Sequence, residues 1–293
     1  MNRIITFKRE RDLGAIITDA FGFIRSEWKP LFMCILKITW PFVAISLFAI
    51  ALYFYTFSNV LDNFSTSNFE SNPFAMFSGS NFLSIILMIF AALATYTLMQ
   101  IVATLYIKSY IENDGQVIYD DIVKQTRNQF WSILGFVILS LILIVLGTIL
   151  CIIPGIYLYV PFSLGITIMV FEEKNIGETI SHCFILVKDH WFETFGVLLV
   201  VSILVGILGY VFNIPSLIYS IVKMATSIGK EDPTAFIGFF SDPIYLLLTV
   251  FSYAGRFLMT VITVIAIVLI YFDLNEQKFQ SGTIETIENL GKN

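Results

Sequence analysis

Charged residues are scarce in this chain of 293 residues, of which 13% are charged and 57% are hydrophobic. Soluble domains carry about 25% charged residues, which cover their surface. The scarcity therefore excludes a soluble enzyme and a disordered chain. The chain is not basic either, because 17 Lys and Arg stand against 22 Asp and Glu. We accordingly expect no nucleic-acid partner.

Cysteine, histidine and catalytic motifs are equally sparse. Three cysteines and two histidines indicate neither a disulfide framework nor a complete metal site, so we expect no metal and no cofactor. Glu178 and His182 share a helix face, but we interpret them, with His190, as solvated surface residues. No Gly-x-Ser-x-Gly, His-Glu-x-x-His or Cys-x-x-Cys motif occurs. The sequence therefore predicts a protein without enzyme activity.

Two acidic pairs leave acid–base catalysis open as an alternative. Asp120-Asp121 and Glu172-Glu173 combine carboxylates that can act as acid and base. No nucleophile or base stands near either pair in the sequence. The favoured interpretation is that these residues cap a helix or form a solvated rim.

Long apolar runs, by contrast, are abundant. A membrane-spanning helix needs about 20 mostly apolar residues. The segments that qualify are Leu31–Phe57, Phe82–Ile107, Phe130–Ile153, Ile156–Phe171, Phe192–Phe212 and Pro243–Phe272. The sequence predicts an all-α, polytopic membrane protein with six transmembrane helices in a single membrane domain over 1–293. We expect residues 273–293 to form a cytoplasmic tail.

The distribution of Lys and Arg predicts the orientation. Cytoplasmic loops carry the excess of these residues. If both termini lie inside, only Lys223 and Lys230 fall in outer loops, and Arg256 lies within a span. The remaining cations face inward, and they are Arg3, Lys8, Arg9, Arg11, Arg25, Lys29, Lys37, Lys108, Lys124, Arg127, Lys174, Lys188, Lys278 and Lys292. We expect a bacterial cytoplasmic (inner) membrane protein with both termini in the cytoplasm.

The outer connections differ in character. Ser58–Asn81 is rich in Ser, Asn and Phe and predicts a loosely packed loop. Ile153-Pro154-Gly155 predicts a tight turn between the third and fourth spans. Leu217–Ile228 is amphipathic, and we expect it to lie on the outer face before a polar turn at residues 229–233.

One segment recurs along the chain. Leu13, Gly14, Ile17, Phe21, Arg25 and Trp28 correspond to Ile176, Gly177, Ile180, Phe184, Lys188 and Trp191 at a constant offset of 163. A weaker copy contains Tyr119, Val123, Arg127 and Phe130. Each copy has the i, i+3, i+4, i+7 spacing of an amphipathic helix. We interpret the copies as interfacial helices whose membrane anchors are Arg25, Trp28, Arg127, Phe130, Lys188 and Trp191.

Each such helix precedes a pair of spans. The sequence therefore predicts three repeats of an interfacial helix plus a helical hairpin, over about 13–107, 115–171 and 176–272. Repeat-built membrane proteins place binding sites at the interfaces between repeats. The alternative is that the repeat serves only insertion and packing.

Residues 154–195 and the end of the last span carry a further pattern. Its parts are Pro154-Gly155-Ile156-Tyr157, Pro161-Phe162, Phe171-Glu172-Glu173-Lys174, Glu178-Thr179-Ile180-Ser181, Leu186-Val187-Lys188-Asp189-His190-Trp191 and Leu269-Ile270-Tyr271-Phe272-Asp273-Leu274. The arrangement resembles the six-helix bacterial membrane-domain family of glycerophosphodiester phosphodiesterases and its free-standing, poorly characterised relatives. In fused members the chemistry resides in a separate soluble barrel, so the resemblance implies a membrane domain without that activity here.

Arg256 is the cation that the sequence places deep in the sixth span. An arginine at mid-membrane costs about 2.5–3.5 kcal/mol on insertion scales and is a functional candidate. Three interpretations stay open. The side chain reaches the outer headgroups, donates to carbonyls freed by Pro41 or Pro161, or lines a polar cavity that binds a lipid phosphate or another anion. Weaker polar candidates for the same cavity are Gln100, Thr104 and Asn213.

Two functions follow from these patterns. The preferred prediction is a non-enzymatic scaffold or subunit of a membrane complex, partnered by membrane lipids and by other membrane subunits or a homo-oligomer. The alternative is a transporter or lipid-handling protein with an anion or headgroup site near Arg256. The sequence does not identify a substrate.

Overall fold

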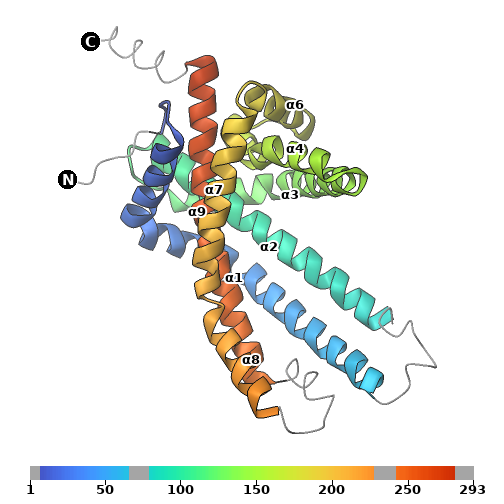
Figure 1. Cartoon of the computed structure of the whole chain (residues 1–293). Helices are drawn as coiled ribbons and strands as arrows, with labels where there is room; N and C mark the ends of the chain where they lie inside the picture. The colour runs from blue at the N-terminus through green and yellow to red at the C-terminus, as the bar shows by residue number, and fades with distance from the viewer. Residues whose placement is uncertain (1–6, 66–78, 228–241, 281–293) are drawn as a thin grey trace. The chain divides into compact units, whose positions relative to one another are not determined.

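The computed structural model describes residues 7–65, 79–227 and 242–280 (Figure 1), and in these ranges it contains helices and no strand. The helices are α1 (Leu13–Ser65), α2 (Gly79–Glu112), α3 (Tyr119–Leu150), α4 (Ile152–Ser163), α5 (Gly165–Glu172), α6 (Ile176–Val187), α7 (Trp191–Val211), α8 (Ile214–Ser227) and α9 (Pro243–Phe279). Six helical stretches are long and apolar enough to cross a membrane, and α4 with α5 form one of them. The predicted all-α class with six spans is confirmed.

The fourth span is interrupted shortly after a proline. Pro161 lies inside α4. Proline lacks the amide hydrogen that continues the hydrogen-bond ladder. The chain leaves the ladder at Leu164, whose amide donates to the Pro161 carbonyl at 3.2 Å, and α5 begins at the next residue.

The predicted turn at residues 153–155 is wrong by a few residues. The chain reverses at Cys151, which is extended with φ −167° and ψ 145°. Pro154 lies in the first turn of α4, where a missing amide hydrogen costs little. Gly155 instead allows α4 to approach α3 closely, because a Cβ at this position would stand 3.1 Å from the Thr148 Cα of α3.

The connections that the sequence predicts on the outer side also contain more helix than predicted. Of the expected loop Ser58–Asn81, residues 58–65 belong to α1 and 79–81 to α2. The amphipathic segment is confirmed as α8, which begins at Ile214. The predicted turn at 229–233 lies outside the described residues. The expected tail begins as helix, because α9 continues to Phe279.

A separate short helix is present in one of the three sequence copies. α6 begins with a capping box in which Asn175 accepts from the Glu178 amide at 3.0 Å, and it ends before α7 starts at Trp191. The other two copies are the first turns of the continuous helices α1 and α3. The expectation of three separate helices is therefore wrong for these copies, and the repeat organisation stays a prediction.

The chain divides into two compact units, which we describe separately. The first comprises Met1–Ile38, Thr97–Val205 and Thr260–Asn293. It buries the last part of α9, from Val261 to Phe272, together with Leu98–Ile107 of α2. Aromatic rings meet edge to face in its core, with centroids 5.5 Å apart for Phe7 and Phe23 and 5.1 Å for Phe171 and Phe272.

The second unit comprises Thr39–Tyr96 and Gly206–Met259. In it α1 and α2 are joined by small polar side chains. The hydroxyls of Ser46 and Thr95 lie 2.6 Å apart, and those of Thr56 and Ser84 lie 2.8 Å apart. Hydrogen bonds of this kind hold helices together where lipid offers no partner.

Candidate functional site

The second unit contains a polar pocket around Arg256. The pocket has a volume of about 360 Å³, which is near the lower end of the range for ligand sites. Its lining combines one guanidinium with an amide and several hydroxyls. The lining residues are Asn213, Ser216, Leu217, Ser220, Ile221, Tyr245, Thr249, Ser252, Tyr253 and Arg256.

Close helix contacts build this pocket. A Cβ on Gly255 would stand 2.2 Å from the Phe212 ring, so only glycine lets α9 approach the end of α7 here. The Ser252 hydroxyl donates to the Phe212 carbonyl at 2.8 Å. This bond occupies one of the carbonyls that the end of α7 leaves without a helical partner. The two contacts set the position from which Arg256 reaches the pocket.

Arg256 lies beside the last turn of α7. Its Cζ stands 5.6 Å from the centre of the Tyr210 ring, in cation–π range. A Cβ on Gly209 would stand 3.4 Å from the Arg256 Cγ. α7 has 21 residues, about 31 Å, which equals the thickness of a hydrocarbon core. A residue level with the end of α7 is therefore level with a membrane boundary, which favours the headgroup interpretation.

The other polar candidates separate in the structure. Asn213 lines the pocket together with Arg256, as predicted for a shared cavity. Gln100 and Thr104 lie on α2 in the first unit and are buried there, and neither is among the lining residues of this pocket. A cavity that they share with Arg256 stays a prediction.

The pocket has the chemistry of an anion site. Asn213 precedes α8 and Ser216 lies in its first turn, so the positive end of the helix dipole borders the pocket. Arg256 adds a guanidinium, whose planar fork matches phosphate oxygens. Among the described lining residues there is no carboxylate to oppose a bound anion.

The predicted membrane anchors are exposed to different degrees. Trp28 is 50% exposed, and Arg25, Arg127 and Lys188 are also exposed. Phe130, however, is only 8% exposed. Its ring packs inside the first unit, while the neighbouring Trp131 is 72% exposed, and the anchor role of Phe130 stays a prediction.

Trp191 is half-buried rather than free at the surface. Its ring stacks on Tyr157 with centroids 5.8 Å apart and on Phe195 at 5.3 Å. Its indole N–H donates to the Tyr157 carbonyl at 3.3 Å. Trp191 therefore joins α7 to α4 in addition to any contact with lipid.

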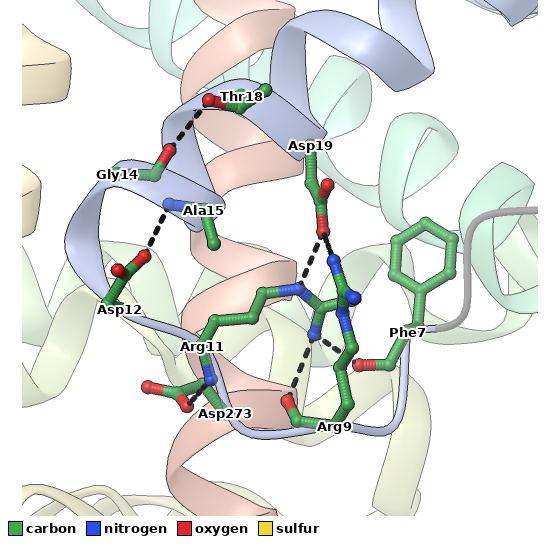
Figure 2. Close-up of polar contacts among 9 residues, drawn as sticks. All are labelled: Phe7, Arg9, Arg11, Asp12, Gly14, Ala15, Thr18, Asp19 and Asp273. Atoms are coloured by element: carbon green, nitrogen blue, oxygen red, sulfur yellow. Dashed lines mark hydrogen bonds and ion pairs between the residues drawn. The ribbon is translucent and has the colours of Figure 1, made fainter.

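Arg11 organises a network in the first unit that the sequence did not reveal (Figure 2). Its side chain is fully buried and donates to Asp19 at 2.9 Å and to the Phe7 carbonyl at 2.5 Å. Its backbone amide donates to the Asp273 carboxylate at 2.7 Å. Burial lowers the pKa of Arg11, and Asp19 opposes that shift. Because 262 positions separate Arg11 from Asp273, no local spacing could predict the contact.

Glu172 is the centre of a second network that sequence reasoning missed. It accepts from the Tyr271 hydroxyl at 2.8 Å and pairs with Lys174 at 2.5 Å. The His182 Nε2 lies 3.2 Å from the same carboxylate. Glu173 pairs instead with the buried Lys108 at 3.1 Å. The interpretation of Glu172 and His182 as solvated residues is corrected, because their side chains, 20% and 15% exposed, join α5, α6 and α9. The Glu173 side chain is 68% exposed, as expected for a solvated rim.

His182 makes the stability of this network depend on pH. Burial lowers the pKa of His182, Lys174 and Lys278 lower it further, and Glu172 opposes them. Below the ordinary histidine pKa, the unfolded chain binds a proton at this histidine more readily than the folded chain does. The contribution of neutral His182 to the free energy of unfolding is therefore present above that pH and is lost as pH falls. We expect the melting temperature to fall by about 2 °C more between pH 7.5 and 5.5 in the native protein than in His182→Gln. His190→Gln, at a more exposed histidine, is the control and should keep the native pH dependence.

Comparison of the chain with known protein families, with curated proteins and with solved structures finds no match. The resemblance to the six-helix membrane-domain family therefore stays a prediction. The fold itself defines the class, a helical multi-pass membrane protein.

Proposed function

We propose that the protein binds the phosphate of an anionic lipid headgroup in the Arg256 pocket. The observation that carries the proposal is the convergence of Arg256, Asn213 and the first turn of α8 on one pocket beside the end of α7. A phosphate there meets a guanidinium and a helix N-terminus together. The protein acts without catalysis, as a lipid-handling component of the membrane.

The proposed setting is a bacterial cytoplasmic membrane with both termini inside. The bias of Lys and Arg toward one side supports this orientation. It places the end of α7, and with it Arg256, at the outer leaflet. The ligand is then a lipid of that leaflet.

Replacement of Arg256 tests the proposal. In nanodiscs that contain phosphatidylglycerol and phosphatidylcholine, we expect Arg256→Gln to retain phosphatidylglycerol about tenfold less well, because a charge-assisted bond is lost. Native mass spectrometry measures the retained lipid. Lys223→Gln is the matched control, since Lys223 already pairs with Asp242 outside the pocket. Equal retention by Arg256→Gln, or binding of inorganic phosphate without the lipid, contradicts headgroup binding.

The second candidate is a scaffold or subunit of a membrane complex. It is favoured by the large side chains that one face of α1 leaves uncovered, with Trp40 64%, Phe48 68% and Tyr55 67% exposed. Extraction with the surrounding lipid, followed by measurement of particle mass, tests it. A homo-oligomer or a fixed stoichiometry with another subunit supports the scaffold, and a monomer contradicts it.

A further inference from the structure

A second polar pocket lies in the first unit. It has a volume of 460 Å³ and lies between α3 and the α5–α6 connection. Carboxamides dominate its lining, which consists of Gln125, Asn128, Gln129, Ser132, Ile133, Met169, Glu173, Lys174 and Asn175.

Two of these carboxamides have buried atoms without a partner. The Oε1 atoms of Gln125 and Gln129 are buried and accept no hydrogen bond. A buried polar atom without a partner is costly, and native proteins leave few of them. Both atoms belong to residues that line the pocket, so a group bound there could supply the missing donors.

The charges in the lining are already neutralised. Lys174 pairs with Glu172 at 2.5 Å, and Glu173 pairs with Lys108 at 3.1 Å. The pocket therefore does not select a ligand by its charge. What it offers is a set of amide and hydroxyl groups that both donate and accept.

We propose that this pocket binds a neutral polyhydroxyl group, such as a sugar ring. Each sugar hydroxyl can donate to Gln125 or Gln129 and accept from a neighbouring amide. The group can belong to a glycolipid headgroup or to a free sugar, since the recognition chemistry is the same. This site does not depend on the Arg256 pocket.

The test compares the full chain with Gln125→Leu/Gln129→Leu in detergent or nanodiscs free of sugar headgroups. The probes are monoglucosyl diacylglycerol, measured by native mass spectrometry, and methyl glucoside, measured by saturation-transfer NMR. We expect the double variant to bind at least about tenfold more weakly. Gln116→Leu, at an exposed amide outside the pocket, should bind as the native chain does.

Each outcome decides the proposal. If the native protein binds the glycolipid and the double variant does not, the result supports a glycolipid headgroup as the ligand. If the native protein binds methyl glucoside and the double variant does not, the result supports a free sugar. Native protein that binds neither probe overturns the proposal, as does equal binding by the double variant. If that variant does not fold, Ser132→Ala takes its place, and the native protein alone can still give the overturning result.

Discussion

Replacing Arg11 with methionine is expected to destabilise the protein by about 3 kcal/mol, which lowers its melting temperature by about 6–12 °C. Methionine keeps much of the volume but removes the bonds to Asp19 and to the carbonyls of Phe7 and Arg9. Those carbonyls are then left without this donor in a buried site. Thermal unfolding in detergent, followed by intrinsic fluorescence, measures the effect.

Arg9 provides the matched control for Arg11. It pairs with the same Asp19 oxygen at 2.6 Å, but its side chain is 50% exposed. An exposed ion pair contributes about 1 kcal/mol or less, so Arg9→Met should change the melting temperature little. Equal losses of melting temperature in the two variants would contradict the claim that burial makes the bonds of Arg11 more stabilising than those of Arg9.

Replacing Gly165 with alanine is expected to cost about 2–3 kcal/mol. A Cβ at Gly165 would stand 2.0 Å from the Phe136 ring. Phe136 is 1% exposed, so its ring has no free space into which it can move. The clash must separate α5 from α3, and the melting temperature should fall by about 4–12 °C.

Gly196 and Phe136 supply the controls for this prediction. Nothing lies within 4 Å of a Cβ at Gly196 in α7, so Gly196→Ala should be neutral or slightly stabilising. Combining Gly165→Ala with Phe136→Leu should restore part of the lost stability. A Gly165→Ala variant as stable as the native protein would contradict the close packing of α3 and α5.

The sequence predicts the spans well because each one is a local property. Apolar runs of sufficient length indicate a helix wherever its neighbours lie, and the run from Pro243 becomes α9. Helix ends were predicted less well. Pro154 indicated a turn, yet it lies in the first turn of α4, because proline is equally suited to a first helical turn.

The sites were predictable only in part. Arg256 stood out because a cation in an apolar run is rare, and Asn213 followed from its place after the fifth span. Asp273 and Tyr271, which bond Arg11 and Glu172, come from positions far along the chain. Sequence spacing carries no information on such contacts, so the two networks emerged only from the structure.

The distance between the Arg256 guanidinium and lipid phosphorus tests headgroup binding most directly. Solid-state NMR of protein with ¹³C-labelled arginine in phosphatidylglycerol bilayers measures it through ¹³C–³¹P dipolar coupling. The account predicts a Cζ–phosphorus distance of about 4 Å and loss of that coupling in Arg256→Gln. The same coupling in the native protein and in Arg256→Gln would contradict it.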